Sequence, residues 1–209
     1  MDGKDTRNDN TLQRAARSAH SDALAPRLAA LFGLVRTERL LLRRPIVEDG
    51  AAMFAVHGDP ATNLYNPHGP DADLATSEET LSQWLRQWME EGYGYWAVTL
   101  PGDEKVIGFG GVRRVRWRDR DILNLYYRFT PAAWGHGYAT EMARAAVGLA
   151  RAHLPAIPII ARVRAANSAS VRTAERAGLM RHPELDTEEH LVFASDGPRE
   201  YPDEKASAG

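Results

Sequence analysis

The sequence predicts one α+β domain built on a mixed, mostly antiparallel sheet flanked by helices. Three observations lead to this prediction. A strand pattern occurs three times between residues 93 and 129, separated by short turns that favour an antiparallel meander. A glycine-rich turn then leads into an amphipathic helix. The next strand, at 159–164, is expected to run parallel to the strand before that turn, because a helix connects the two.

The remaining elements follow from hydrophobic periodicity and from capping residues. Leucines at 40–42 indicate a first strand, and Asp49 is expected to cap the helix after it. Thr76 and Glu79 have the spacing of a capping box and are expected to open a longer helix. The predicted strands lie at 37–43, 93–100, 106–116, 122–129, 159–164 and 189–194, and the predicted helices begin near 49, 76, 139 and 167.

The chain of 209 residues is long enough for a single domain with a full core. We expect the folded domain to span residues 34–195. Residues 1–33 are expected to form a partly disordered extension, and residues 196–209 a polar tail.

Composition excludes several classes of function. The net charge of −2 gives no reason to expect a nucleic acid or an anionic membrane as partner. The chain has no cysteine, so disulfides, thiolate catalysis and cysteine-bound metals are excluded. No apolar run approaches the roughly 18 residues that a membrane span needs, and the polar N-terminus does not resemble a signal peptide. We therefore expect a cytoplasmic monomer or homodimer.

The most informative segment is the glycine turn, Trp134–Glu141, in which Gly135 and Gly137 stand two residues apart. A turn of this kind at the start of a helix leaves several backbone N–H groups unpaired, with the positive end of the helix dipole behind them. Such a site binds anions, and a phosphate or pyrophosphate is the expected ligand. The turn therefore predicts a phosphorylated cofactor.

The order of the elements resembles the GCN5-related N-acetyltransferase (GNAT) superfamily, and in particular the branch of ribosomal-protein N-terminal acetyltransferases. The resemblance covers roughly 37–194. It depends on the order and spacing of several short segments, each weak alone. These segments are Thr37–Leu40, Val106–Gly111, Trp134–Glu141, Asn167–Ser170 and Glu175–Leu179.

The resemblance implies acetyl-CoA as the cofactor, with coenzyme A as product. It implies that the turn's backbone amides hold the pyrophosphate and that strands four and five of the sheet splay apart around the pantetheine arm. Trp134 stands where many members have Arg or Gln, a common change in this branch. The implied cofactor-binding residues are Phe129, Trp134, Gly135, His136, Gly137, Tyr138, Ala139, Thr140 and Asn167.

The sequence departs from the family at both proton-transfer positions. Asn124 stands where many relatives have a glutamate as general base; it cannot take a proton at neutral pH, but it can hold a water. Ala174 stands where many relatives have a tyrosine that protonates the thiolate. In this branch a serine one turn earlier often has that role, and Ser170 matches it. The alternative for Ser170 is a helix cap with no catalytic role.

Other polar residues have simpler explanations. His136 is expected to face solvent, and no spacing of His and acidic residues supports a metal site. The basic cluster Arg113, Arg114, Arg116 and Arg118 is most simply a solvated strand end, with attraction of an acidic peptide as the alternative.

These observations favour an acetyl-CoA-dependent N-acyltransferase. It would transfer acetyl to a primary amine, on a protein N-terminus or a small molecule, by direct attack in a ternary complex. The alternative is a non-catalytic acyl-CoA-binding regulatory module, suggested by the two missing proton-transfer side chains. A dinucleotide-binding enzyme does not fit, because the turn follows an antiparallel meander and no acidic ribose-binding residue follows it at the usual distance.

Overall fold

The structure is a computed structural model that describes residues 24–195. The tail expected at 196–209 and most of the extension expected at 1–33 lie outside the described residues. Residues 24–32 form a helix that places Leu28 and Phe32 in the main core, so the packed part of the chain includes residues before 34.

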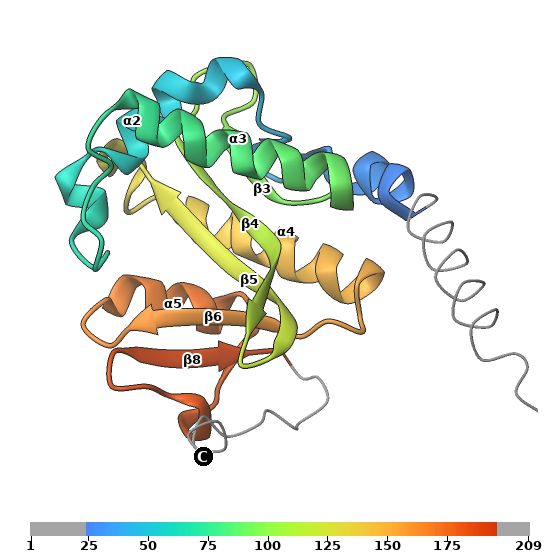
Figure 1. Ribbon diagram of the computed structural model, residues 1–209, viewed down its shortest axis with the longest axis vertical. Coiled ribbons are helices and arrows are strands. Elements are labelled where there is room, and N and C mark those ends of the chain that lie inside the picture. The colour runs from blue at the N-terminus through green and yellow to red at the C-terminus, as the bar shows by residue number, and fades with distance from the viewer. Residues whose placement is uncertain (1–23, 196–209) are drawn as a thin grey trace, which may run out of the picture.

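The fold is α+β, with one open eight-stranded sheet in the order β1-β2-β3-β4-β5-β6-β8-β7 (Figure 1). All neighbours are antiparallel except β5 and β6, which confirms the predicted meander and the predicted parallel pair. The strands are β1 (Leu34–Arg36), β2 (Leu41–Arg43), β3 (Tyr95–Thr99), β4 (Gly108–Trp117), β5 (Arg120–Phe129), β6 (Ile159–Arg164), β7 (Met180–Arg181) and β8 (His190–Ala194).

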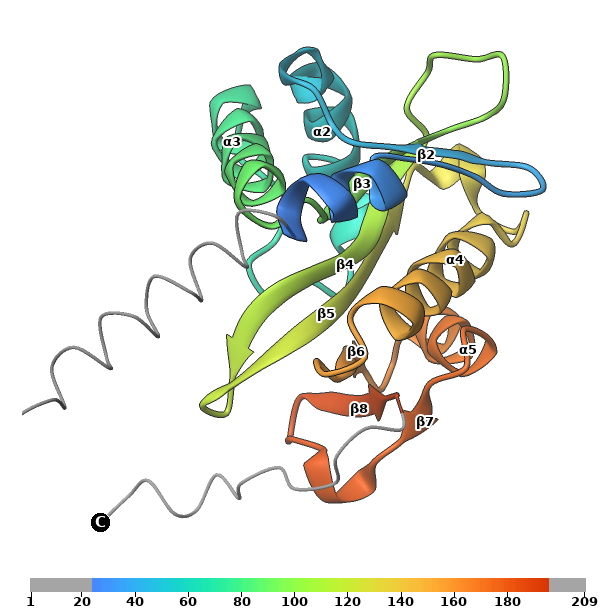
Figure 2. The same ribbon diagram turned by 90° about the vertical axis from the view of Figure 1, so that its right-hand side faces the viewer.

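Helices cover both faces of the sheet, as Figure 2 shows: α2 and α3 lie on one side, and α4 and α5 on the other. Besides the helix at 24–32, the α-helices within the described residues are α2 (Gly50–His57), α3 (Leu74–Glu91), α4 (Tyr138–His153) and α5 (Ser168–Arg176).

Three local predictions were wrong in detail. The expected first strand at 37–43 is a turn followed by β2, because the Thr37 hydroxyl accepts the Leu40 N–H at 3.1 Å and closes the chain on itself. Helix α3 begins at Leu74, two residues before Thr76, since Asp73 caps it by accepting the Thr76 N–H at 2.8 Å. Asp49 precedes α2 but does not cap it, because its carboxylate binds the Arg43 guanidinium at 2.7 Å.

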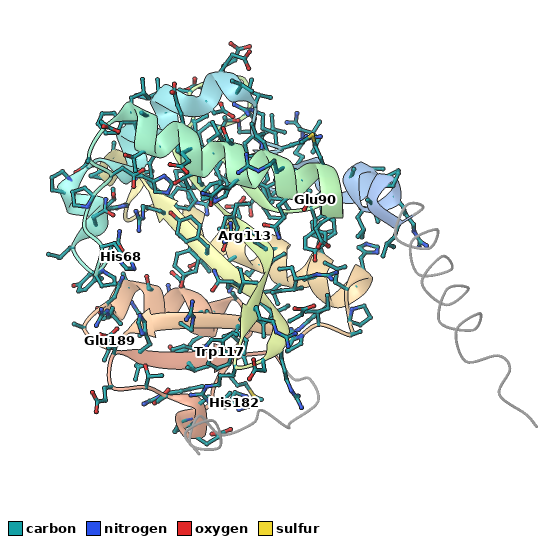
Figure 3. The ribbon with its side chains drawn as sticks, viewed as in Figure 1. His68, Glu90, Arg113, Trp117, His182 and Glu189 are labelled. Atoms are coloured by element: carbon teal, nitrogen blue, oxygen red, sulfur yellow. The ribbon has the colours of Figure 1, made fainter. Side chains whose placement is uncertain are left out.

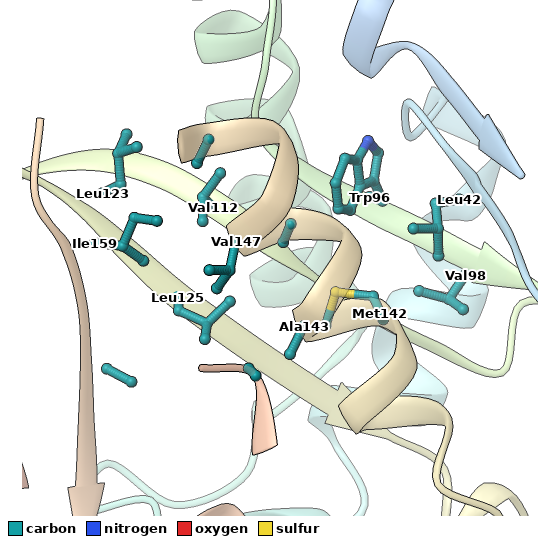
Figure 4. Packing of buried hydrophobic residues seen from close by; sticks show 14 of the residues in the cluster. Leu42, Trp96, Val98, Val112, Leu123, Leu125, Met142, Ala143, Val147 and Ile159 are labelled. Carbon is teal, nitrogen blue, oxygen red and sulfur yellow. The ribbon is translucent and has the colours of Figure 1, made fainter. Parts of the chain in front are cut away.

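The main core lies between the sheet and α4. Met142, Ala143, Ala146, Val147 and Ala150 are buried along one side of α4, at the spacing of a helix face. Figure 4 shows Met142, Ala143 and Val147 among residues of the facing strands. This packing fixes the start of α4, and therefore the glycine turn, against the end of β5.

A second core fills the space under α2 and α3. Trp84 of α3 packs edge-on against Tyr95 of β3, with ring centroids 4.9 Å apart. Met53, Val56, Leu81 and Phe109 complete the cluster. The two cores give the sheet two faces with different neighbours, and the strands between them carry the site.

Strands β5 and β6 pair only at Leu123 with Ile159 and at Asn124 with Ile160. Beyond these two pairs β5 continues to Phe129 without a strand on that side, whereas β6 continues beside β8. The sheet is therefore splayed between β5 and β6. These are the strands that the resemblance identified as the family's fourth and fifth, and it implied that they splay apart.

Candidate functional site

The glycine turn follows β5 through a short 3-10 helix, Pro131–Ala133, and leads into α4. Gly135 and Gly137 both have a φ of +79°, a conformation that residues with a side chain rarely adopt. The turn is exposed to solvent, and a Cβ at Gly135 would have no atom within 4 Å. Glycine at these two positions serves the shape of the backbone, which turns its N–H groups outward.

The N–H groups of Gly135–Thr140 form a run of potential donors. Among the described residues none of them donates to a backbone carbonyl, and the first helical bond of α4 comes from Glu141 to the Gly137 carbonyl at 3.1 Å. Unpaired N–H groups at a helix start, with the dipole behind them, attract an anion. The turn therefore presents the donors that a pyrophosphate would need.

The side chains of the turn shape its outer wall. The Trp134 indole donates to the Phe129 carbonyl at 2.8 Å, which ties the turn to the end of β5. His136 is exposed, as predicted, and stacks on Tyr138 with centroids 5.3 Å apart. Phe129 itself is buried in the main core, so its side chain supports the turn from below.

A polar brace that the sequence analysis missed holds the turn from the other side. Glu141, in the first turn of α4, accepts hydrogen bonds from the Thr37 hydroxyl at 2.6 Å and from the Arg39 backbone and Nε at 2.8 and 2.7 Å. Arg39 also donates to the His136 carbonyl at 2.9 Å and lies over the Tyr138 ring. Burial alone would raise the pKa of Glu141, but the bonds from Thr37 and Arg39 outweigh it and lower that pKa.

A cavity of about 590 Å³ opens beside this brace at the start of α4. Its lining includes Gly137, Thr140, three arginines (Arg39, Arg144 and Arg176) and two glutamates (Glu38 and Glu141). Glu141 is neutralised by its ion pair with Arg39, so Arg144 and Arg176 supply the remaining positive charge. Unpaired backbone donors and guanidinium groups together form an environment for several phosphate oxygens. The residues present thus fit the phosphate-rich half of coenzyme A.

The splay between β5 and β6 is bridged by a hydrogen bond to α5. The buried Tyr127 hydroxyl of β5 donates to the Ser170 carbonyl at 2.8 Å, so β5 and α5 are linked across the splay. Asn167 caps α5 by accepting the Ser170 N–H at 3.0 Å, which leaves its amide nitrogen as a donor. The Ser170 hydroxyl is half-buried and has no hydrogen bond within residues 24–195, so Ser170 is not the helix cap.

Asn124 lies on the opposite face, under α3. Its amide nitrogen donates to the Tyr95 hydroxyl at 2.7 Å, and the Tyr95 ring lies 4.9 Å from that of Tyr126. The Tyr126 hydroxyl in turn lies 2.6 Å from His57 Nε2. Asn124 therefore stands at one end of a buried polar chain, at the point where β5 and β6 separate.

The environment of that chain keeps its groups uncharged at neutral pH. Burial lowers the pKa of His57 to about 4, with Arg128 adding to the shift and Asp71 opposing it. Burial also raises the pKa values of Tyr95 and Tyr126. The Nδ1 atom of His57 is buried without a described partner. This cluster was not identified from the sequence. His57 ends α2, and the one available signal was that Tyr126 stands two residues after Asn124, on the same face of β5.

The predicted site residues thus form two groups. The cofactor residues from Phe129 to Thr140 are contiguous in space, and Asn167 and Ser170 lie across the splay from Tyr127 of β5. Asn124 lies on the other face of the sheet. Within residues 24–195 no three His or acidic side chains lie close enough to hold a metal ion, and no helix is long and apolar enough to cross a membrane.

Comparison with known proteins connects this geometry to a family. The family model described as the acetyltransferase (GNAT) domain matches residues 39–180, more than half of the chain. The uncharacterized protein YkkB of Bacillus subtilis is 27% identical over 153 residues, which cover 68% of this chain and 83% of that protein.

Solved structures agree in fold. An acetyltransferase from Agrobacterium tumefaciens is 26% identical, with a TM-score of 0.67 over 78% of this chain and 93% of that one. The ribosomal L7/L12 α-N-protein acetyltransferase RimL, solved with coenzyme A, is 14% identical with a TM-score of 0.61, and covers 78% of this chain and 97% of that one. At that identity the likeness shows the fold alone. With the family match over residues 39–180 and the turn and splay described above, the chain belongs to the GNAT family of acetyltransferases.

Proposed function

We propose that the protein transfers an acetyl group from acetyl-CoA to a primary amine, on a protein N-terminus or a small molecule. The observation that carries the proposal is the run of unpaired N–H groups from Gly135 to Thr140, beside a cavity with three arginines. Family membership supports acetyl-CoA as the donor, and RimL is a relative in fold that acts on a protein α-amino group.

Acetyl-CoA supplies a thioester whose carbonyl carbon accepts the lone pair of the neutral amine as the C–S bond breaks. The chain positions the two reactants, which alone lowers the barrier substantially. Gly135–Thr140 would hold the pyrophosphate, Arg39, Arg144 and Arg176 would supply positive charge to the phosphates, and the Asn167 amide would donate to the pantetheine arm.

Two side chains move protons in this proposal. Asn124, anchored on Tyr95, uses its free carbonyl oxygen to hold a water that takes the proton of the attacking amine. Ser170, whose hydroxyl has no other partner within the described chain, gives its proton to the leaving thiolate. Neither residue needs to be charged for its role.

A calorimetric titration with acetyl-CoA, with NAD and ATP as controls, tests the cofactor. We expect micromolar binding of acetyl-CoA alone, and transfer to at least one amine in an acceptor panel. Binding without transfer to any amine would instead favour a regulatory acyl-CoA-binding module, a reading motivated by the asparagine at the usual position of the base. Absence of binding would overturn both.

A further inference from the structure

Two arginines near Asn124 lack the ion pairs that their sequence neighbours Arg114 and Arg164 form. Arg114 binds Glu91 at 3.1 Å, and Arg164 binds Glu189 at 3.2 Å. Arg113 and Arg162 form no ion pair with any described carboxylate. The Nε atom of Arg113 is also shielded from solvent and has no described hydrogen-bond partner. Because buried donors are nearly always paired in folded proteins, the unpaired Nε of Arg113 indicates a ligand. Arg162 is exposed, so its guanidinium is accessible to the same ligand.

Both arginines lie on the face that carries Asn124. Arg113 of β4 stands directly opposite Asn124 of β5, and its guanidinium lies 5.4 Å from the centroid of the Tyr95 ring. Arg162 lies on β6 two residues beyond Ile160, the partner of Asn124, and therefore on the same face just past the separation of the strands. The positive charges of both arginines act on Tyr95, the hydrogen-bond partner of Asn124.

The backbone that carries Arg162 is held in place by buried neighbours. Arg162 is flanked by the buried Ala161 and Val163, which pack against the main core on the other face. Figure 3 shows Arg113 in the middle of the face below α3, and Glu189, the partner of Arg164, far from it at the edge. Glu189 is already paired with Arg164, and Arg162 is exposed and forms no ion pair with a described carboxylate.

We propose that Arg113 and Arg162 bind an oxyanion of the acceptor, so that the preferred substrate is a primary amine with a carboxylate or phosphate close to the amino group. This inference rests on the proposed acetyl transfer and specifies its substrate class. Guanidinium groups match carboxylate and phosphate geometry with paired hydrogen bonds. The same two charges repel polycationic amines, so aminoglycosides and polyamines are disfavoured acceptors.

Matched acceptors test the proposal in a steady-state assay of thiol release. The peptide amides Ser-Glu-Glu-Phe and Ser-Gln-Gln-Phe present the same α-amino group with and without carboxylates, and spermidine presents a polycation. We expect kcat/KM to be at least tenfold higher for the acidic peptide than for its neutral partner, with spermidine lower still. Free glutamate and its diamide form a second pair, again with and without carboxylates. Comparing kcat/KM between this pair and the peptides distinguishes a small acceptor from a peptide.

Variants then assign the preference to the two side chains. Arg113→Gln and Arg162→Gln should each reduce kcat/KM for the acidic peptide about tenfold, mainly through KM, and leave the neutral peptide unchanged. Arg162→Glu should reverse the order of the acidic peptide and a Ser-Lys-Lys-Phe amide. Arg86→Gln, at an exposed position of α3, is the matched control and should change neither.

The outcomes distinguish failure of the anion site from failure of the proposed acetyl transfer. If acetyl-CoA binds and acetyl transfer occurs with equal kcat/KM for acidic and neutral acceptors, the anion site is wrong and the acetyltransferase proposal stands. The same holds if a preference exists but survives both Arg→Gln changes. If no acceptor is acetylated although every variant binds acetyl-CoA, acetyl transfer itself fails and the anion site fails with it.

Discussion

The two faces of the sheet around the splay are built in different ways. On the α4 side, the candidate cofactor site consists largely of backbone N–H groups from one continuous segment, Gly135–Thr140. On the α3 side, the candidate acceptor site consists of side chains from separate strands and helices, such as His57, Asn124 and Arg162. A site made of backbone depends on local conformation, whereas a site made of side chains depends on charge and burial. The two should therefore respond to different kinds of change.

The largest expected effect is loss of the backbone site. Gly137→Val places a branched side chain at a φ of +79°, which disfavours the turn that exposes the N–H groups. We expect acetyl-CoA binding to fall below detection in calorimetry while far-UV circular dichroism stays that of the folded protein. Gly102→Val, also at a positive φ of +81° with open space around it, is the control and should bind normally. Unchanged affinity in Gly137→Val would show that the turn is not the cofactor site.

The next largest expected effect is a loss of stability at low pH, caused by protonation of the buried His57 on the acceptor side. The pKa of His57 is about 4 in the folded protein and near 6.5 when unfolded, so the unfolded chain binds the proton more tightly. The stability from neutral His57 is complete above about pH 6.5 and is lost as pH falls towards 4, by about 3 kcal/mol in all.

Urea unfolding between pH 7.5 and 4.5 measures this loss in the wild type and in His57→Gln, which removes the titrating group. The wild type should lose more of its free energy of unfolding over that interval than the variant does. Parallel pH curves for the two proteins would mean that His57 titrates normally, and that the acceptor side is open to water.

A smaller effect is expected where the two sides meet. Ser170→Ala removes the proposed proton donor, and we expect kcat to fall about tenfold, equivalent to about 1.4 kcal/mol, with acetyl-CoA affinity unchanged. Ser168→Ala, on the exposed surface of the same helix turn, serves as control. A normal kcat in Ser170→Ala would leave thiolate protonation to solvent or to another group.

The smallest effect tests the brace that positions the backbone site. Glu141→Gln keeps the shape but weakens the bonds from Thr37 and Arg39, and should cost about 1 kcal/mol of stability at pH 7. Because the pKa of Glu141 is lowered in the folded protein, its contribution is fully present above the carboxylate's unfolded pKa and is lost as pH falls through the lower, folded pKa. Thermal melts at pH 7 and pH 3 measure this; a difference between wild type and variant that is equal at both values would contradict it.

The sequence predicted the candidate cofactor site, which is built from one continuous segment, better than the candidate acceptor site, which is built from separate elements. The turn, the meander and the parallel strand were predictable because each is a short pattern read along the chain. The brace joins Arg39 to Glu141 across 102 residues, and the polar chain joins His57 to Tyr126 across 69, so no local pattern announced either. The three mistaken details at Thr37, Asp49 and Thr76 have a related cause. Each polar side chain has several possible hydrogen-bond partners, and only the folded structure shows which of them it binds.

The splay has a consequence for how the sheet avoids unwanted partners. From Leu125 to Phe129, β5 has no neighbouring strand on one side, although it lies in the middle of the sheet and not at its margin. A bare strand edge normally invites another polypeptide to add to it, and proteins protect such edges with charge, proline or a covering element. Here the edge is internal, because β6 and β8 continue the sheet beyond it and Tyr127 is tied to α5 across it. A second protein chain would need to force these parts open, whereas a slender, amide-bearing molecule can lie along the edge. The narrow opening beside β5 thus restricts the width of a ligand, independently of the side chains that would contact it.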